Sequence, residues 1–238
     1  MGLFDKKFCD ICSKKIGLLG NRKLEDGNMC KDCAGLLSPF TSERRRTTLA
    51  DIREHLAYRE TNKAEVTNFS ATRSIGSRTR VLLDEDKGKF IVTSSNRWQA
   101  ENPDVIDFSQ VTGCETEIRE SRTEIRTTDQ NGRSVSFNPP RYDIDYDFYV
   151  TIHVNSPYFQ QIQFKLNGSR VDVRGSVEFR EFERQALDIK QALTQLRQGV
   201  RDSIAAANAP KTARNCPCCG ATCIPDANGR CEFCGGAM

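Results

Sequence analysis

Eleven cysteines constrain this chain more than any other feature of its sequence. Eight of them form four C-x-x-C pairs, two near each end, with 17 residues between the pairs of the first group and 11 in the second. Two such pairs offer four thiolates that can converge tetrahedrally on Zn²⁺, at about 2.3 Å per bond. The candidate metal ligands are Cys9, Cys12, Cys30 and Cys33 in the first group, and Cys216, Cys219, Cys231 and Cys234 in the second.

Other cysteine chemistries fit this spacing less well. The N-terminus lacks the apolar core of a signal peptide, so we expect a cytoplasmic protein, and the cytosol is too reducing for disulfides. A redox dithiol explains one pair, but two matched pairs favour a metal. A catalytic zinc keeps one coordination position open, whereas four cysteines fill the shell. We therefore predict two structural zinc sites, each replacing a core that so short a segment cannot build.

Three cysteines lie outside these pairs. Cys218 lies inside the first pair of the second group and Cys223 lies between its two pairs; either could substitute for a ligand, although we expect both to point away from the metal. Cys114 lies in a predicted strand, where a free thiol acts as a small core residue.

The middle of the chain has the pattern of a β domain. Short runs of alternating apolar and polar residues, bounded by turn residues, predict about seven or eight antiparallel strands. Arg80–Leu83 and Lys89–Thr93 flank a turn at Asp84–Gly88, and such a set of strands predicts an antiparallel barrel or sandwich. Further strands are expected at residues 105–108, 114–118, 123–128, 134–137, 146–154 and 162–166.

A helix is predicted after the strands, over residues 176–200. It could close an open end of the barrel, or it could pair with another copy as a coiled coil. About three heptads is short for an independent coiled coil, which favours closure of the barrel. The apolar stripe recurs at steps of three and four residues and consists of Phe179, Phe182, Ala186, Ile189, Leu193, Leu196 and Val200.

The connector between the first cysteine group and the strands carries a helix pattern at Leu49, Ile52 and Leu56, with Thr47 or Thr48 as its N-cap. It also carries Arg44–Arg46, the only run of three basic residues. This run is either a phosphate contact or a solvated loop, and we favour the loop. The net charge is only +3, from 35 basic and 32 acidic residues, which does not indicate a nucleic-acid binder.

These patterns divide the chain into five segments. No run of about 18 apolar residues is present, so we expect no transmembrane helix. No phosphate loop, histidine-containing metal motif or nucleophile elbow is present, so we expect no enzymatic activity. The predicted segments are a zinc domain at 1–37, a helical connector at 38–65, a β domain with its closing helix at 66–207, a linker at 208–214 and a zinc ribbon at 215–238.

Several motifs carry a resemblance to known proteins. Cys9-x-x-Cys12, Lys23–Gly27 and Cys30–Cys33 resemble an N-terminal four-cysteine domain of unassigned function that is found in bacteria and phages. In that family a module similar to a pleckstrin-homology (PH) domain often follows, and residues 69–108 resemble it. The segment from Cys216 to Gly235 is similar to a bacterial zinc ribbon. The resemblance implies zinc binding and a PH-like fold, and it implies no activity.

The resemblance also bears on ligands. PH domains that bind phosphoinositides use basic residues in the first hairpin loop, whereas Asp84–Lys89 is net acidic and would repel an anionic headgroup. We therefore expect a non-enzymatic adaptor or scaffold that binds a protein partner through the PH-like domain. The alternative is a nucleic-acid-associated regulator that uses the zinc ribbons and Arg44–Arg46. The partner's identity is not predicted, and homo-oligomerisation is left open.

Overall fold

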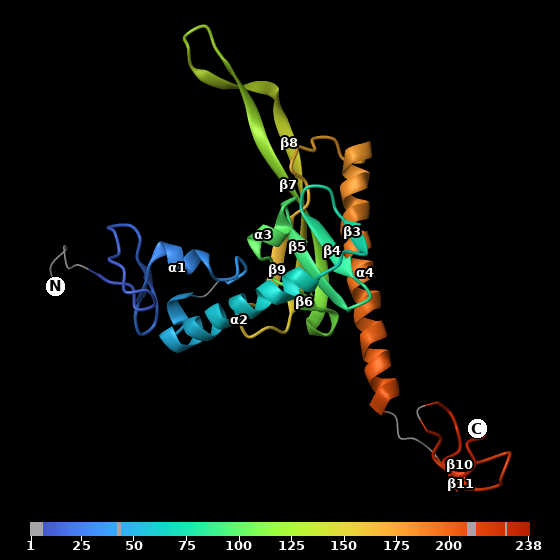
Figure 1. The fold of residues 1–238 in the computed structure, drawn as a ribbon. Helices are drawn as coiled ribbons and strands as arrows, with labels where there is room; N and C mark the ends of the chain where they lie inside the picture. The colour runs from blue at the N-terminus through green and yellow to red at the C-terminus, as the bar shows by residue number, and fades with distance from the viewer. Residues whose placement is uncertain (1–6, 42–43, 209–212, 227) are drawn as a thin grey trace. The chain divides into compact units, whose positions relative to one another are not determined.

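The computed structural model describes residues 7–41, 44–208, 213–226 and 228–238. The chain divides into two compact units, Met1–Gln198 and Gly199–Met238 (Figure 1). Strands dominate the first unit, and helices precede and follow them. Most of the predicted linker, residues 209–212, lies outside the described residues.

The first unit begins with a short hairpin and two helices. The N-cap predicted at Thr47 or Thr48 is Thr48, and it forms a capping box: its side chain accepts the Asp51 N–H while the Asp51 carboxylate accepts the Thr48 N–H. The hydrophobic core here includes Ile52, so the connector helix completes the first cysteine unit. The elements are β1 (Arg22–Lys23), β2 (Asn28–Met29), α1 (Lys31–Gly35), η1 (Arg44–Arg46) and α2 (Leu49–Asn68).

The strands of the middle form two separate antiparallel sheets. The first has the order β3-β4-β5-β6, with β3 at Arg73–Ile75, β4 at Arg80–Asp84, β5 at Lys89–Thr93 and β6 at Ile106–Asp107. A short helix, α3 (Trp98–Glu101), precedes β6. The second has the order β7-β8-β9, with β7 at Val111–Thr128, β8 at Ser134–Val154 and β9 at Gln161–Lys165.

Of the predicted barrel or sandwich, the barrel is therefore wrong. Strand β6 has only two residues, and the turn η2 (Phe108–Gln110) separates it from β7. Within the described residues β7 pairs only with β8, so no hydrogen-bond ladder joins the two sheets. The arrangement is mainly β with helices, and the sheets stay open.

The hairpin β4–β5 is buried along almost its whole length. On one face Leu82 and Ile91 pack with Phe69, and Trp98 covers them from α3. Their neighbours in the two strands are buried as well, among them Phe90, which stacks on Phe108 at 6.1 Å. Burial on both faces explains the continuous apolar runs of these strands.

Strands β7 and β8 are longer than the sequence pattern indicated. The segments expected as four short strands merge into two, because cross-strand pairing continues through charged residues such as Arg119, opposite Asp147. A bulge lies between Ile125 and Arg126, and the β8 residues opposite it contain the cis bond Asn138–Pro139. Beyond the end of β9 the hairpin continues as two strands alone (Figure 1), and we call residues 119–128 and 134–145 the β-arm.

The part of helix α4 (Val177–Asn208) that belongs to the first unit, up to Gln198, packs on the three-stranded sheet. Its predicted stripe is buried from Phe179 to Leu193 and half-buried at Leu196 and Val200. Phe179 lies 5.1 Å from Phe148 and 5.2 Å from Tyr146, ring centre to ring centre. The first half of the stripe therefore packs on β8, so the helix covers a sheet and does not close the end of a barrel.

A buried polar network joins α2 to the loop before β6. The guanidinium of Arg59 lies 2.8 Å from the carboxylate of Asp104, and their side chains are 10% and 0% exposed. The hydroxyls of Ser38 and Tyr58 also donate to Asp104, at 2.8 and 3.3 Å. Asn62 adds a pair of bonds, accepting from the Val105 N–H and donating to the Pro103 carbonyl. These contacts fix the connector helix to the β domain.

His55 lies beside this network and is buried as well. Its Nε2 accepts the N–H of Ser38 at 3.2 Å, and its ring stacks on Tyr158 at 4.5 Å. Burial, and then the charge of Arg59, lower the pKa of His55 from 6.5 to about 4. The histidine is therefore a neutral acceptor in the folded chain.

We predict that the Arg59–Asp104 pair supports stability strongly. Either R59M or D104L should reduce the free energy of unfolding by about 3–5 kcal/mol, because each leaves an unpaired buried charge. The double variant R59M/D104L should lose less than the two singles together. Urea denaturation followed by the fluorescence of Trp98, the single tryptophan, measures this. K63M breaks an exposed pair on the same helix as a control and should cost at most about 1 kcal/mol. The prediction would be contradicted if R59M and D104L each reduced the free energy of unfolding as little as K63M does.

We also predict that His55 stays neutral in mildly acidic solution. Because its pKa is lower in the folded chain than the unfolded value of 6.5, its contribution to stability decreases as the pH falls from 6.5 towards about 4. The chain has two histidines, so NMR of the imidazole protons, with H153Q for assignment, resolves each titration. A His55 signal that titrates near 6.5 in the folded protein would contradict this.

Candidate metal centres

The first cysteine group closes around a single point. The Sγ atoms of Cys9, Cys12, Cys30 and Cys33 all lie within 4.8 Å of one another. Two of the separations are 3.8 Å, between Cys9 and Cys33, and 3.7 Å, between Cys12 and Cys30. A tetrahedron with metal–sulfur bonds of about 2.3 Å has edges of about 3.8 Å. The group can therefore hold a tetrahedral metal ion with little adjustment.

The second group has the same form. Cys216, Cys219, Cys231 and Cys234 also lie within 4.8 Å of one another, with Cys216–Cys234 at 3.5 Å and Cys219–Cys231 at 3.7 Å. A hairpin of β10 (Arg214–Asn215) and β11 (Thr222–Cys223) carries the first pair. The structure thus brings together all eight cysteines that the sequence singled out, in the two groups expected.

Three of the four C-x-x-C pairs share one turn. In each, the carbonyl of the first cysteine accepts the N–H four residues later, and its own N–H donates to the carbonyl five residues later. The residue four after the first cysteine has positive φ: Ser13 at 59°, Gly220 at 73° and Gly235 at 72°. Glycine suits this conformation best, as in the second group, whereas Ser13 adopts it at some strain.

The remaining pair is built differently. Cys30 is the N-cap of α1, and its Sγ accepts the N–H of Cys33 at 3.4 Å. The N–H of Cys30 in turn donates to the Sγ of Cys9 at 3.3 Å. A helix N-terminus and several N–H donors favour negative charge on these sulfurs, which is the charge state that a metal requires.

The two groups already stabilise thiolate in part. Burial opposes ionisation of Cys9, but the N–H groups of Cys12 and Cys30 outweigh it and lower the pKa of Cys9 to about 6. In the second group, the N–H of Cys234 lowers the pKa of Cys231 to about 6. At Cys33, burial and the neighbouring thiols raise the pKa, as expected where several thiols share protons.

The surplus cysteines near the second group differ from each other. Cys218 is exposed, as expected. Cys223 does not point away: it is buried, with its Sγ 3.5 Å from that of Cys231 and 3.4 Å from the Sδ of Met238. The core of this unit consists of Cys216, Cys223 and Cys231, with Met238 packed against them. So small an apolar core cannot hold a fold without another link.

The N-terminal part of the chain matches a known family. Residues 7–55 match a family model described as a domain of unknown function, DUF4428. That range contains the first cysteine group and the start of α2, including Ile52, in agreement with their shared core. No curated protein and no solved structure matches the chain. The predicted resemblance to a four-cysteine domain of unassigned function is confirmed for this segment.

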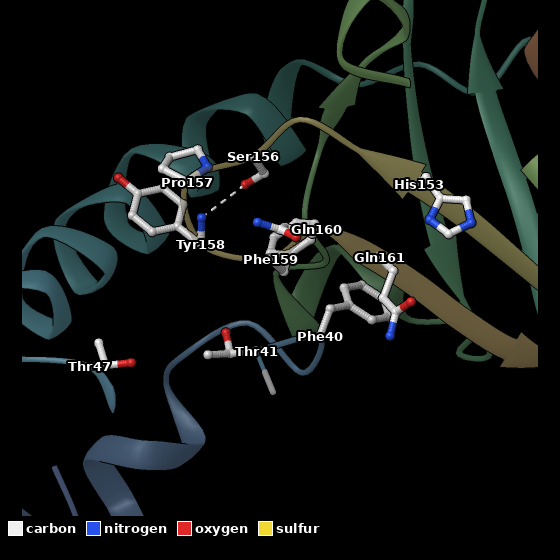
Figure 2. A pocket seen from close by; sticks show the side chains of 10 residues that line it. All are labelled: Phe40, Thr41, Thr47, His153, Ser156, Pro157, Tyr158, Phe159, Gln160 and Gln161. Atoms are coloured by element: carbon white, nitrogen blue, oxygen red, sulfur yellow. Dashed lines mark hydrogen bonds between the residues drawn. The ribbon is translucent and has the colours of Figure 1, made fainter. Parts of the chain in front are cut away.

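A groove in the first unit is a second candidate site, which the sequence did not reveal. It has a volume of about 560 Å³ and lies beside β9, between the loop after β8 and the segment at Phe40 (Figure 2). Its lining is neutral and polar with aromatic rings, including His153, Tyr158 and Gln161. Phe40 and Phe159 meet there at 5.6 Å. Loop and strand residues from distant segments form it, so no local motif marks it.

None of the helices in the described part of the chain is long and apolar enough to span a membrane.

We predict two bound metal ions per chain and one independent loss for each disrupted group. C33S should remove the first ion and C231S the second, since each deletes one of four donors. C114S and C223S should retain both ions and serve as controls. Elemental analysis of purified protein, combined with native mass spectrometry, gives the counts. Loss of an ion from C223S, or retention of both in C33S, would contradict the ligand sets.

Proposed function

We propose that the chain is a non-enzymatic adaptor whose terminal units are stabilised by zinc. The observation that supports this proposal most directly is that each cysteine group supplies four sulfurs at tetrahedral spacing. Zinc is the ion that most often binds four cysteine thiolates in this geometry, and four protein ligands leave it no open position for substrate. We propose a stabilising role for both ions. Bound zinc would act by holding chain segments together. We also propose a cytoplasmic location, where cysteines stay reduced and can bind metal.

We propose that the middle of the chain is PH-like. Four antiparallel strands, then three, then a helix that packs on the second sheet support this reading. The resemblance of the sequence motifs to bacterial and phage proteins supports it independently. The hairpin loop at Asp84 carries carboxylates, and Asp84 itself is buried and accepts the N–H groups of Ser70 and Lys87. That loop is unsuited to an anionic lipid headgroup.

We place the adaptor's docking site in the groove beside β9. Gln161 and Gln163 are exposed on β9, which is the end strand of its sheet, so an extended peptide can add to this edge. The neutral polar lining and the aromatic pair of Phe40 and Phe159 suit an uncharged segment with a bulky apolar side chain. The proposed occupant is a segment of a protein partner with that character.

A nucleic-acid role is the second candidate. Turn η1 lies next to β1, which brings the exposed Arg45 and Arg46 near Arg22 and Lys23. Such a basic cluster at the first cysteine unit could contact phosphates. The nearly balanced total charge of the chain argues against a strong electrostatic contribution to nucleic-acid binding.

The two candidates differ in their response to salt. Peptides selected from a random library on the intact, metal-loaded protein should bind with affinities that change only a few-fold between about 50 and 200 mM salt, because few charges are involved. Q161W should weaken that binding about tenfold or more by filling the groove, as a lost hot-spot contact does. Q163W, on the same exposed face of β9, should leave it unchanged. Fluorescence anisotropy measures both.

Two outcomes would overturn the adaptor proposal. One is peptide binding that ignores Q161W. The other is that no binding peptide can be selected while an oligonucleotide does bind. In that case its affinity should fall about a hundredfold or more over the same salt range, and the dependence of affinity on salt should be lost in R45A.

A further inference from the structure

The β-arm offers an interaction surface that the proposed function does not use. Strand β7 is at the end of its sheet, and in the described residues it pairs only with β8. Over the arm, residues 119–128 of β7 are almost all exposed, so their outer backbone edge faces water. An edge strand of this length is a template for a further strand.

The two edges of the arm are not equivalent. On β8, Pro139 and Pro140 lie in the segment that bulges opposite Ile125 and Arg126. Proline has no N–H to donate, and a bulge bends the strand, so this edge is protected against strand addition. Residues 119–128 of β7 contain neither proline nor glycine and run without a gap. Only the β7 edge is open.

The charges along the open edge alternate in sign. Glu120, Arg122, Glu124 and Arg126 follow at every second residue and so project from one face. Among the described residues, Arg122 pairs with Glu120 and Arg126 pairs with Glu124 at 3.7 Å along the strand, and Arg126 also donates to the Ser134 carbonyl. The arginine side chains of these pairs are exposed and the glutamate side chains are half-buried, and surface pairs of this kind contribute little to the stability of the monomer, so their charges can also attract another partner.

This pattern is complementary to itself in one register. When two copies of β7 lie antiparallel around a twofold axis at Thr123, Glu120 faces Arg126 of the second copy, and Arg122 faces Glu124 of the second copy. Symmetry repeats both pairs. With the axis at Arg122 or at Glu124, that charged residue faces its own copy, and its charged neighbours also face residues of like charge, which is unfavourable. The axis at Thr123 gives more opposite-charge pairs than any other register of the arm.

We propose that two copies of this chain associate through the β7 edges of their β-arms, antiparallel and centred on Thr123. Residues 118–128 of each copy form the shared ladder, and the two three-stranded sheets become one continuous sheet. The groove beside β9 is at the other edge of the sheet, so dimerisation and peptide docking are independent.

Charge reversal tests both the dimer and its register. Sedimentation equilibrium of the intact, metal-loaded protein should show a dimer of twice the 26.8 kDa monomer. In an E120R dimer, the introduced arginine faces Arg126 of the second copy, and symmetry gives two such pairs. In an R126E dimer, the introduced glutamate faces Glu120 of the second copy, again in two pairs. Each should weaken dimerisation about tenfold or more. R133E makes the same charge change in the turn of the arm, outside the ladder, and should have no effect.

Restoring complementarity should restore the dimer. The double variant E120R/R126E reverses both members of each pair and should dimerise like the parent. A mixture of the E120R and R126E chains should form a heterodimer, which also shows that both monomeric variants are folded. A parent chain that stays monomeric, a dimer indifferent to E120R and R126E, or failure of both rescues would overturn the proposal.

Discussion

Convergence of four thiolates is the interaction on which both ends of this chain depend. Each group ties two segments that are distant in sequence to one point, with separations between sulfurs that match a tetrahedral shell. Around the second group, the apolar core of the described residues is three cysteines and a methionine. Hydrophobic burial of that size does not offset the entropy of ordering the segment, so we expect metal binding and folding to be one event there.

The first unit shows how a four-cysteine segment is attached to a larger domain. Helix α2 belongs to both: near its start Ile52 completes the core around Cys9 and Cys30, and further along Arg59 is paired with the buried Asp104. His55 lies between these two regions and joins them through Ser38 and Tyr158. Helix α2 is continuous, and it makes apolar contacts near its start and buried polar contacts further along. The four-cysteine segment and the β domain therefore have little freedom to separate.

The sequence predicted those features that depend on local spacing. The two cysteine groups, the N-cap at Thr48 and the buried stripe from Phe179 to Leu193 follow from intervals of three or four residues, which fix a turn or a helix face. Features that depend on distant partners were missed. The Arg59–Asp104 pair joins residues 45 positions apart. In the β-arm, the strands predicted at 123–128 and 134–137 form, but residues 119–122 and 138–145 were not predicted as strand, because both faces of the arm meet water and no apolar alternation marks residues such as Arg119 to Arg122. The open sheets could not be distinguished from a barrel because strand pairing is not a local property.

Hydrogen exchange, followed by mass spectrometry before and after chelation of the metal, tests the central claim most directly. Loss of the metal should remove protection from residues 8–37 and 214–238, and from the start of α2 near Ile52, because the thiolates and their shared core lose their link. Strands β4, β5 and β8, whose cores contain no cysteine ligand, should keep their protection. Unchanged exchange at both ends after complete metal removal would contradict the account, as would collapse of the β sheets together with the ends.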